Sequence, residues 1–191
     1  GGRLVGIISS RGEFLKVETD ESGRVLCVSV DQDGEEVKLV RYRYDDRGDM
    51  VETIDALDVS KHFIYSGGHL LVQLTNQGGM SFHWEYEGKG ENARCVHTWG
   101  DGGVMEYFIR YGKGYTHIRN GENAETEYYY GEDKLIYKIV DANGGITRHQ
   151  YNSFQELEVT VNPEGYTHKT AYNEFGRPVR ITDENEEDTF L

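Results

Sequence analysis

The sequence predicts an all-β protein, and three observations lead to that prediction. The composition combines 24 Gly, 14 Tyr and 7 Phe with only 2 Pro, which favours turns and aromatic strand formers over helices. Apolar residues alternate with polar ones over short stretches, as at Val179 and Ile181, and Asn/Asp/Gly clusters separate these stretches. Large aromatic residues recur at a regular interval. We therefore expect an antiparallel meander of roughly sixteen short strands built from β-hairpins.

A tyrosine ends one strand of each repeating unit and acts as its structural anchor. Successive anchors are 21, 21, 25, 19, 21 and 21 residues apart. Another large side chain often stands two residues earlier, such as Phe63 or Trp84, and residues i and i+2 share a strand face. We expect these side chains to form a ladder on one face of the sheet. The anchors are Tyr44, Tyr65, Tyr86, Tyr111, Tyr130, Tyr151 and Tyr172.

Two polar turns fall in each unit, so that each unit contributes two strands. Gly23, Gly48 and Gly176 are predicted turn glycines, at places where the backbone takes a left-handed conformation. Gln155 occupies the matching place of its unit, so this turn either tolerates Gln at a strained angle or has another geometry. In the longest unit we expect a longer loop or a bulge around Gly88 to Asn92.

Some strands also carry apolar residues at the intervening positions. Leu71, Ile136 and Val140 are examples. Alternation is lost when both faces of a strand are covered, so we expect such strands to be covered on both faces in places, or to contact a neighbouring layer.

Residues 1–191 are expected to form a single repeat array, because no Pro/Ser-rich linker interrupts the period. The array is expected to begin and end within a repeat, because the next anchor would fall about 21 residues after Tyr172, just past Leu191. The net charge of -14 argues against a nucleic-acid partner, since such proteins need clustered Lys and Arg. No stretch approaches the roughly 18 apolar residues of a membrane helix, so no membrane span is expected.

The acidic turn at Asp31, Asp33 and Glu36 offers spaced oxygens of the kind that bind calcium. Gly34 comes too early for a calcium loop, and a hairpin turn is the favoured interpretation. The seven histidines lack the close spacing of a zinc site, and we interpret them as partly buried sheet residues. Free, buried thiols are favoured over a disulfide for Cys27 and Cys95.

We predict no catalytic residue, no metal and no cofactor, and we expect that the protein is not an enzyme. The sequence contains neither a G-x-S-x-G nucleophile elbow nor a phosphate-binding glycine loop. An alternative function is a surface binding module that recognises carbohydrate or a protein partner through exposed aromatic residues such as Trp84 and Trp99. Sheet packing is favoured for the aromatic ladder, because the ladder follows the repeat period.

The repeating unit consists of Tyr, Asp or Asn, two polar residues, Gly, Arg and an aliphatic run. It resembles the YD repeat of the Rhs family, which includes bacterial polymorphic toxins, the C component of insecticidal toxin complexes and the animal teneurins. Tyr42 to Ala56 and Tyr172 to Glu184 carry the resemblance. His97 to Gly103, HTWGDGG, is similar to a segment of Rhs proteins from bacterial secretion systems. The resemblance covers essentially the whole chain.

The resemblance implies a curved or spiralling sheet that forms a segment of a hollow Rhs-type shell. The implied function is structural: the shell encloses a C-terminal toxin domain of a bacterial secreted effector and helps to deliver it. The implied partners are the remaining repeats and the enclosed toxin domain, and exposed edge strands suggest edge-to-edge self-association of the fragment. The implied location is the bacterial cytoplasm before export, then outside or in a target cell. No residue matches the family's autoproteolysis segment, so autocleavage is not implied here.

Overall fold

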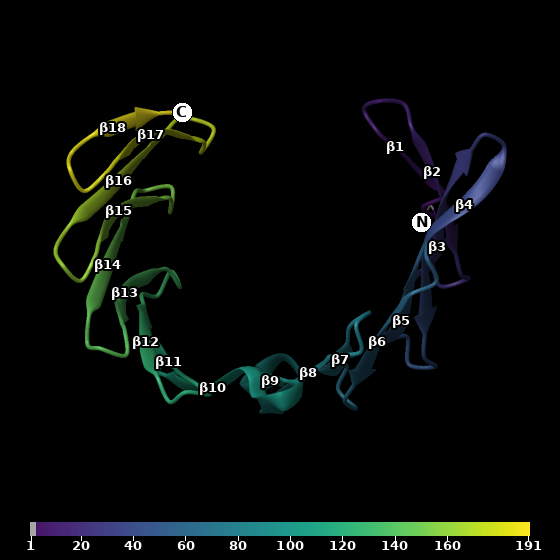
Figure 1. Ribbon diagram of the computed structural model, residues 1–191, viewed down its shortest axis with the longest axis horizontal. Helices are drawn as coiled ribbons and strands as arrows, with labels where there is room; N and C mark the ends of the chain where they lie inside the picture. The colour runs from purple at the N-terminus through teal and green to yellow at the C-terminus, as the bar shows by residue number, and fades with distance from the viewer. Residues whose placement is uncertain (1–2) are drawn as a thin grey trace. The chain divides into compact units, whose positions relative to one another are not determined.

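The computed structural model describes residues 3–191, which form β-strands connected by short turns (Figure 1). The chain divides into two compact units, one ending at Val104 and the other beginning at Met105. Within each unit every strand pairs antiparallel with the next strand along the chain. The predicted all-β class and antiparallel meander are thereby confirmed.

The first unit contains nine strands and two single-turn 3-10 helices. These elements are β1 (Gly6–Ile8), β2 (Phe14–Thr19), β3 (Val25–Gln32), β4 (Glu35–Tyr44), β5 (Met50–Asp55), β6 (Ser60–Tyr65), β7 (Leu71–Thr75), β8 (Ser81–Glu87), η1 (Gly90–Asn92), β9 (Arg94–Gly100) and η2 (Asp101–Gly103). The helix η1 lies in the long connection that the sequence predicted between Gly88 and Asn92.

The second unit continues the same pattern. Its strands are β10 (Val104–Gly112), β11 (Tyr115–Asn120), β12 (Glu125–Tyr130), β13 (Ile136–Val140), β14 (Ile146–Tyr151), β15 (Leu157–Val161), β16 (Thr167–Tyr172), β17 (Pro178–Thr182) and β18 (Asp188–Phe190). The structure thus has eighteen strands in residues 3–191, and the prediction of roughly sixteen was too low.

Most turns share one hydrogen-bonded geometry, which the turn after Tyr172 illustrates. The Asn173 N–H donates to the Arg177 carbonyl at 2.9 Å, and the Gly176 N–H donates to the Asn173 carbonyl at 3.1 Å. The Asn173 Oδ1 also accepts from the N–H groups of Phe175 and Arg177. This is a type I turn that ends in a left-handed residue, with an Asx side chain at its first position.

The fourth residue of this turn has a positive φ whether or not it is glycine. Gly23, Gly48 and Gly176 occupy this position with φ values of 85°, 90° and 70°. Gln155 occupies it as well, with φ 65°, so its turn keeps the common geometry and tolerates the strained angle. Asp58, His69, Asn123, Lys134 and Glu186 lie at the same position with φ between 61° and 66°.

A β-bulge follows six of the seven anchor tyrosines. In one example Ile64 pairs with Gln73 but Tyr65 pairs with Leu71, so that Val72 is the additional residue. The same shift places Ile136 opposite Tyr130. The apolar residues at Leu71 and Ile136 therefore reflect a change of register, which corrects the interpretation that a second layer covers these strands.

Each unit is a single layer with little conventional core and with two chemically different faces. In residues 3–191 the buried hydrophobic side chains are Val17, Cys27 and Ile54. One face, here called the aromatic face, carries pairs such as Phe63 with Leu74 and Tyr128 with Ile139. The opposite face, here called the polar face, carries pairs such as Glu52 with His62 and Tyr129 with Lys138. Cross-strand partners share a face, so the ladder register defines both surfaces.

Within residues 3–191, no helix has the length and apolar character needed to cross a membrane.

The left-handed turn positions generate a stability prediction. Replacing Gln155 by Gly should raise the free energy of unfolding by about 1 kcal/mol, because glycine adopts positive φ without the Cβ clash. The control Gln150→Gly, within β14, should lower it by about 0.5–1 kcal/mol, because glycine weakens a strand interior. Urea unfolding midpoints measure both effects. A Gln155→Gly variant no more stable than wild type would contradict the assigned strain.

Candidate functional site

The anchor tyrosines form the recurring side-chain site of this protein. Four of their hydroxyl groups donate to a backbone carbonyl of the preceding strand, each at 2.9 Å. These bonds are Tyr44 to Val25, Tyr86 to Leu71, Tyr151 to Ile136 and Tyr172 to Leu157. The acceptor is in each case the first residue of its strand, where that strand bulges against its other neighbour.

A carbonyl at a bulge lies where the regular hydrogen-bond ladder is interrupted. The tyrosine hydroxyl supplies a donor there, and its ring spans the intervening distance. Burial raises the pKa of Tyr44 and of Tyr86, which keeps both hydroxyl groups protonated and able to donate. The bulge of one repeat is thus linked to the anchor tyrosine of the next repeat.

The remaining anchors occupy related positions. Tyr65 and Tyr130 end β6 and β12 opposite bulge residues, and burial also raises the pKa of Tyr65. The backbone N–H of Tyr130 donates to the Gly114 carbonyl at 3.0 Å. Tyr111 differs, because it pairs with Thr116 in a regular ladder and β10 continues to Gly112.

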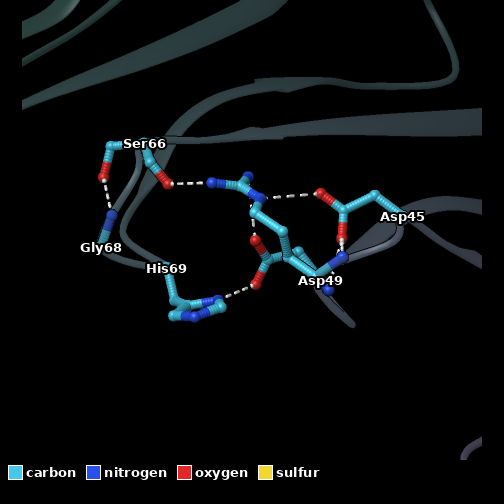
Figure 2. A network of polar contacts seen from close by, with 6 residues as sticks. Asp45, Asp49, Ser66, Gly68 and His69 are labelled. Carbon is cyan, nitrogen blue, oxygen red and sulfur yellow. Dashed lines mark hydrogen bonds and ion pairs between the residues drawn. The ribbon is translucent and has the colours of Figure 1, made fainter.

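Two successive turns on one edge of the first unit are joined by a polar network that the sequence did not predict (Figure 2). Arg47 donates to the Ser66 carbonyl at 2.9 Å and forms an ion pair with Asp49 at 3.0 Å. The Nδ1 atom of His69 lies 2.7 Å from the other oxygen of Asp49, whose side chain is 8% exposed (Figure 2). This network ties the turn that follows Tyr44 to the turn one repeat later.

Asp45 holds the first of these turns together. Its Oδ1 accepts the N–H groups of Arg47 and Asp49, both at 2.9 Å. Partial burial works to raise the pKa of Asp45, but the N–H of Asp49 and the Arg47 guanidinium outweigh it and hold the pKa below its usual range. Asp45 therefore remains an ionised acceptor at neutral pH.

Trp99 stacks on two histidines on the polar face of the first unit. Its ring stacks on His97 at a centroid distance of 4.3 Å and on His83 at 5.1 Å. Asp101 and Glu85 lie 3.2 Å and 3.4 Å from the respective imidazole nitrogens of His83 and His97. His83 and His97 thus occupy stacking positions on the indole that a sugar ring would need.

Trp84, the other tryptophan considered for binding, belongs to the opposite face. It pairs with Thr98 across β8 and β9 on the aromatic face. The two tryptophans therefore do not form one binding surface.

The acidic residues considered for calcium lie in and beside the β3–β4 hairpin. Asp33 and Gly34 form its left-handed turn, with φ 56° and 88°, and Asp31 accepts the Gly34 N–H at 3.0 Å. Glu36 accepts from Ser29 at 2.8 Å and from Lys16 at 2.9 Å. Its carboxylate is thus engaged in side-chain contacts on the sheet, away from the turn. In the described part of the chain, no three His, Cys, Asp or Glu residues are arranged to hold a metal ion.

Cys27 and Cys95 do not form a disulfide in the structure, and the Cys95 thiol donates to the His97 carbonyl at 3.4 Å. Cys27 is buried and Cys95 is half-buried, and burial raises the pKa of each thiol. A raised pKa keeps the thiol protonated and lowers its reactivity.

The repeated parts of the site are the tyrosine bonds and the Asx turns, and their side chains serve structural hydrogen bonding.

The tyrosine bonds can be tested by removing single hydroxyl groups. We expect Tyr172→Phe and Tyr151→Phe each to lower the free energy of unfolding by about 1 kcal/mol, because a carbonyl then loses its donor. Tyr166→Phe is the matched control, since Tyr166 is 52% exposed in a turn, and it should change stability by less than about 0.5 kcal/mol. Equal effects of the three substitutions in urea unfolding would refute a special role for the anchor hydroxyl groups.

The Asx turns predict acid sensitivity. The N–H groups of Val59 and Leu57 hold the pKa of Asp55 below its usual range, and those of Glu187 and Asn185 do the same for Asp183. A lowered pKa in the folded state means that the unfolded chain binds protons more readily. The stabilisation is therefore complete above the ordinary Asp pKa of about 3.9 and is lost as the pH falls below it.

We expect the double variant Asp55→Asn, Asp183→Asn to lose less stability than wild type between about pH 5 and about pH 3. The amide oxygens can keep the turn bonds without titrating. Asp46→Asn, at the second position of its turn, is the control and should follow the wild-type pH profile. Urea midpoints measured at each pH provide the comparison. Parallel profiles for wild type and the double variant would contradict the prediction.

Comparison with known proteins adds a sequence relative and a fold. The chain is 24% identical over 151 residues to a probable deoxyribonuclease RhsB of Dickeya dadantii, a match that covers 78% of this chain and 10% of that protein. The chain thus spans about a tenth of the length of its curated relative. No known family model matches the sequence.

Solved structures of toxin complexes share the fold. The Tc holotoxin pore of Photorhabdus luminescens matches with a TM-score of 0.56 and 11% identity, over 97% of this chain and 13% of that chain. A complex of TcdB2, TccC3 and Cdc42 matches with a TM-score of 0.56 and 12% identity, over 94% of this chain and 12% of that chain. The match to an Rhs protein and the fold shared with Tc toxin structures both support the resemblance of the tyrosine-anchored repeat to the YD repeat of the Rhs family.

Proposed function

We propose that this chain is a segment of the wall of an Rhs-repeat shell, which encloses a C-terminal toxin domain of a secreted bacterial effector and helps to deliver it. The role of these residues in the proposal is structural and non-catalytic. The proposed partners are further repeats of the same polypeptide and the enclosed toxin domain. The parent protein would reside in the bacterial cytoplasm before export and then be secreted or delivered to a target cell.

One observation carries the proposal: the tyrosine of one unit is bonded to the bulge of the preceding one. The same joint can extend a single-layer sheet by any number of units, because each unit contacts its neighbours and needs no distant core. An extended sheet of this kind suits a wall. The likeness to an Rhs protein and to the fold of Tc toxin structures supports the same function.

The polar side chains near the strands also suit a wall better than an active site. In the network of Asp45, Arg47 and Asp49, the carboxylates are occupied by turn N–H groups or by the Arg47 guanidinium. Such groups hold turns in place and are not poised to exchange protons with a substrate.

The test uses the full-length parent polypeptide under limited proteolysis. We expect its C-terminal domain to resist trypsin in the wild type and to become accessible in the variant Tyr151→Ala, Tyr172→Ala, because two joints of the wall are lost. Tyr166→Ala, which changes an exposed turn tyrosine, should leave the protection unchanged. Mass spectrometry of the fragments gives the readout.

Two outcomes would reject the proposal. A parent polypeptide without further YD units or without a C-terminal domain has nothing to enclose. A C-terminal domain that trypsin cleaves equally fast in the wild type and in the double variant is not shielded by this wall.

A further inference from the structure

The polar face of β13 to β16 carries three cationic side chains, here called the basic face: Lys138, Arg148 and Lys169. Lys138 lies directly opposite Arg148. Arg148 pairs with Val161 of β15, and Lys169 pairs with Val159 of the same strand β15. Because cross-strand partners and i, i+2 neighbours share a face, the three cations project from one surface.

These cations have no carboxylate partner among residues 3–191. The ammonium group of Lys138 lies 3.5 Å from the ring centroid of Tyr129, a cation–π contact. Arg148 and Lys169 are exposed. Like charges directly opposite each other destabilise a sheet, and an anion bound to both Lys138 and Arg148 would offset their repulsion.

Equivalent positions in the first unit carry no such pair. Glu52 faces His62 and Gln73 faces His83 at the corresponding places, one repeat apart from each other. The repeat does not require cations here, and the like-charged pair is specific to the second unit.

Acidic side chains of the same and neighbouring strands are engaged or lie at the margin of the basic face. Glu127 accepts the Tyr129 hydroxyl at 2.6 Å, and Asp188 forms an ion pair with Arg180 at 3.4 Å. Glu158 is exposed at the bulge of β15. The basic face is therefore a local positive surface in a chain whose net charge is -14.

We propose that the basic face binds an acidic polypeptide segment, which lies across β13 to β16. Neighbouring strands are about 4.8 Å apart, so Lys138 and Arg148 lie about 5 Å apart along the direction of this segment and Lys169 about 10 Å further on. The guanidinium of Arg148 can hold a carboxylate through two parallel hydrogen bonds. Arg148 is accordingly the central contact and the two lysines flank it.

The surroundings favour a peptide over a nucleic acid. Acidic turns border the strands on both edges, with Asp133 at one edge and Asp141 and Glu164 at the other. A phosphate backbone needs a longer run of cations to release its counterions and would pass close to these turns. A short acidic segment fits between them. This inference concerns the surface of the chain itself and does not depend on the proposed enclosure of a toxin.

The experiment measures binding of a fluorescein-labelled oligoglutamate peptide to the intact chain by fluorescence anisotropy. The triple variant Lys138→Gln, Arg148→Gln, Lys169→Gln should bind about tenfold more weakly or worse. The matched control Lys113→Gln, Lys134→Gln, Arg177→Gln has the same net charge but changes cations of turns, and it should bind within about twofold of wild type. Arg148→Lys should lie between wild type and the triple variant, because it keeps the charge but loses the paired hydrogen bonds.

Three outcomes would overturn the proposal. They are an equal loss in the control, which would indicate general electrostatics, no binding of the peptide by wild type, and tighter binding of a single-stranded oligodeoxynucleotide of equal charge. Circular dichroism and urea unfolding of every variant establish that the fold is retained, so that a loss of binding is assigned to the basic face.

Discussion

The hydrogen bond from an anchor tyrosine to a bulge carbonyl is the interaction on which the rest of the sheet depends. In a single layer, few side chains can be buried, and Val17, Cys27 and Ile54 are the buried hydrophobic ones in residues 3–191. Core packing therefore contributes less to stability here than in an ordinary domain. The tyrosine bond compensates in part, because each contributes about 1 kcal/mol and recurs along the chain. It also fixes register, since a slip by one residue would move the ring to the other face.

The turns are the second local source of order. The backbone bonds of a type I turn with a left-handed fourth residue form in nearly every turn, and an Asx oxygen usually adds two more. At Gly131 no side chain is available, yet its N–H still donates to the Leu135 carbonyl and its carbonyl accepts from Lys134, both at 3.2 Å. Asp133 then binds the Leu135 N–H at 3.0 Å. The turn geometry is therefore robust to loss of its first side chain, which explains why the repeat persists where its sequence is irregular.

The sequence predicts the structural features that depend on residues close together in the chain. It does not predict the features that depend on how neighbouring strands pair. The all-β class, the period and the hairpin at Asp33 and Gly34 follow from local patterns. The bulges do not, because only the ladder register places Leu71 opposite Tyr65, and this led to the mistaken second layer. Val140 is different, since it pairs with Glu127 on the polar face and no shift explains it.

Contacts between successive turns were equally hidden in the sequence. Asp49 and His69 are 20 residues apart, and nothing in either turn alone indicates that an imidazole reaches the carboxylate. The cation pair of the basic face required the register of β13 and β14. In each case the residue types were visible in the sequence, but their proximity was not.

The tyrosine bonds and turns that hold the sheet together lie at strand ends, which leaves the residues of the polar face able to vary from repeat to repeat. Tyrosine bonds and turns hold each repeat through residues at strand ends, so the mid-strand positions of the polar face take no part in these joints. The same cross-strand position accordingly holds Glu52 with His62 in one repeat and Gln73 with His83 in the next repeat. In the second compact unit, which begins at Met105, the same position holds Lys138 with Arg148. Neither the tyrosine bonds nor the turns require this pair. A repeat that is held together by contacts at its strand ends can therefore change the charge of its polar face without losing its fold. We expect any specificity for a partner to depend on these mid-strand pairs.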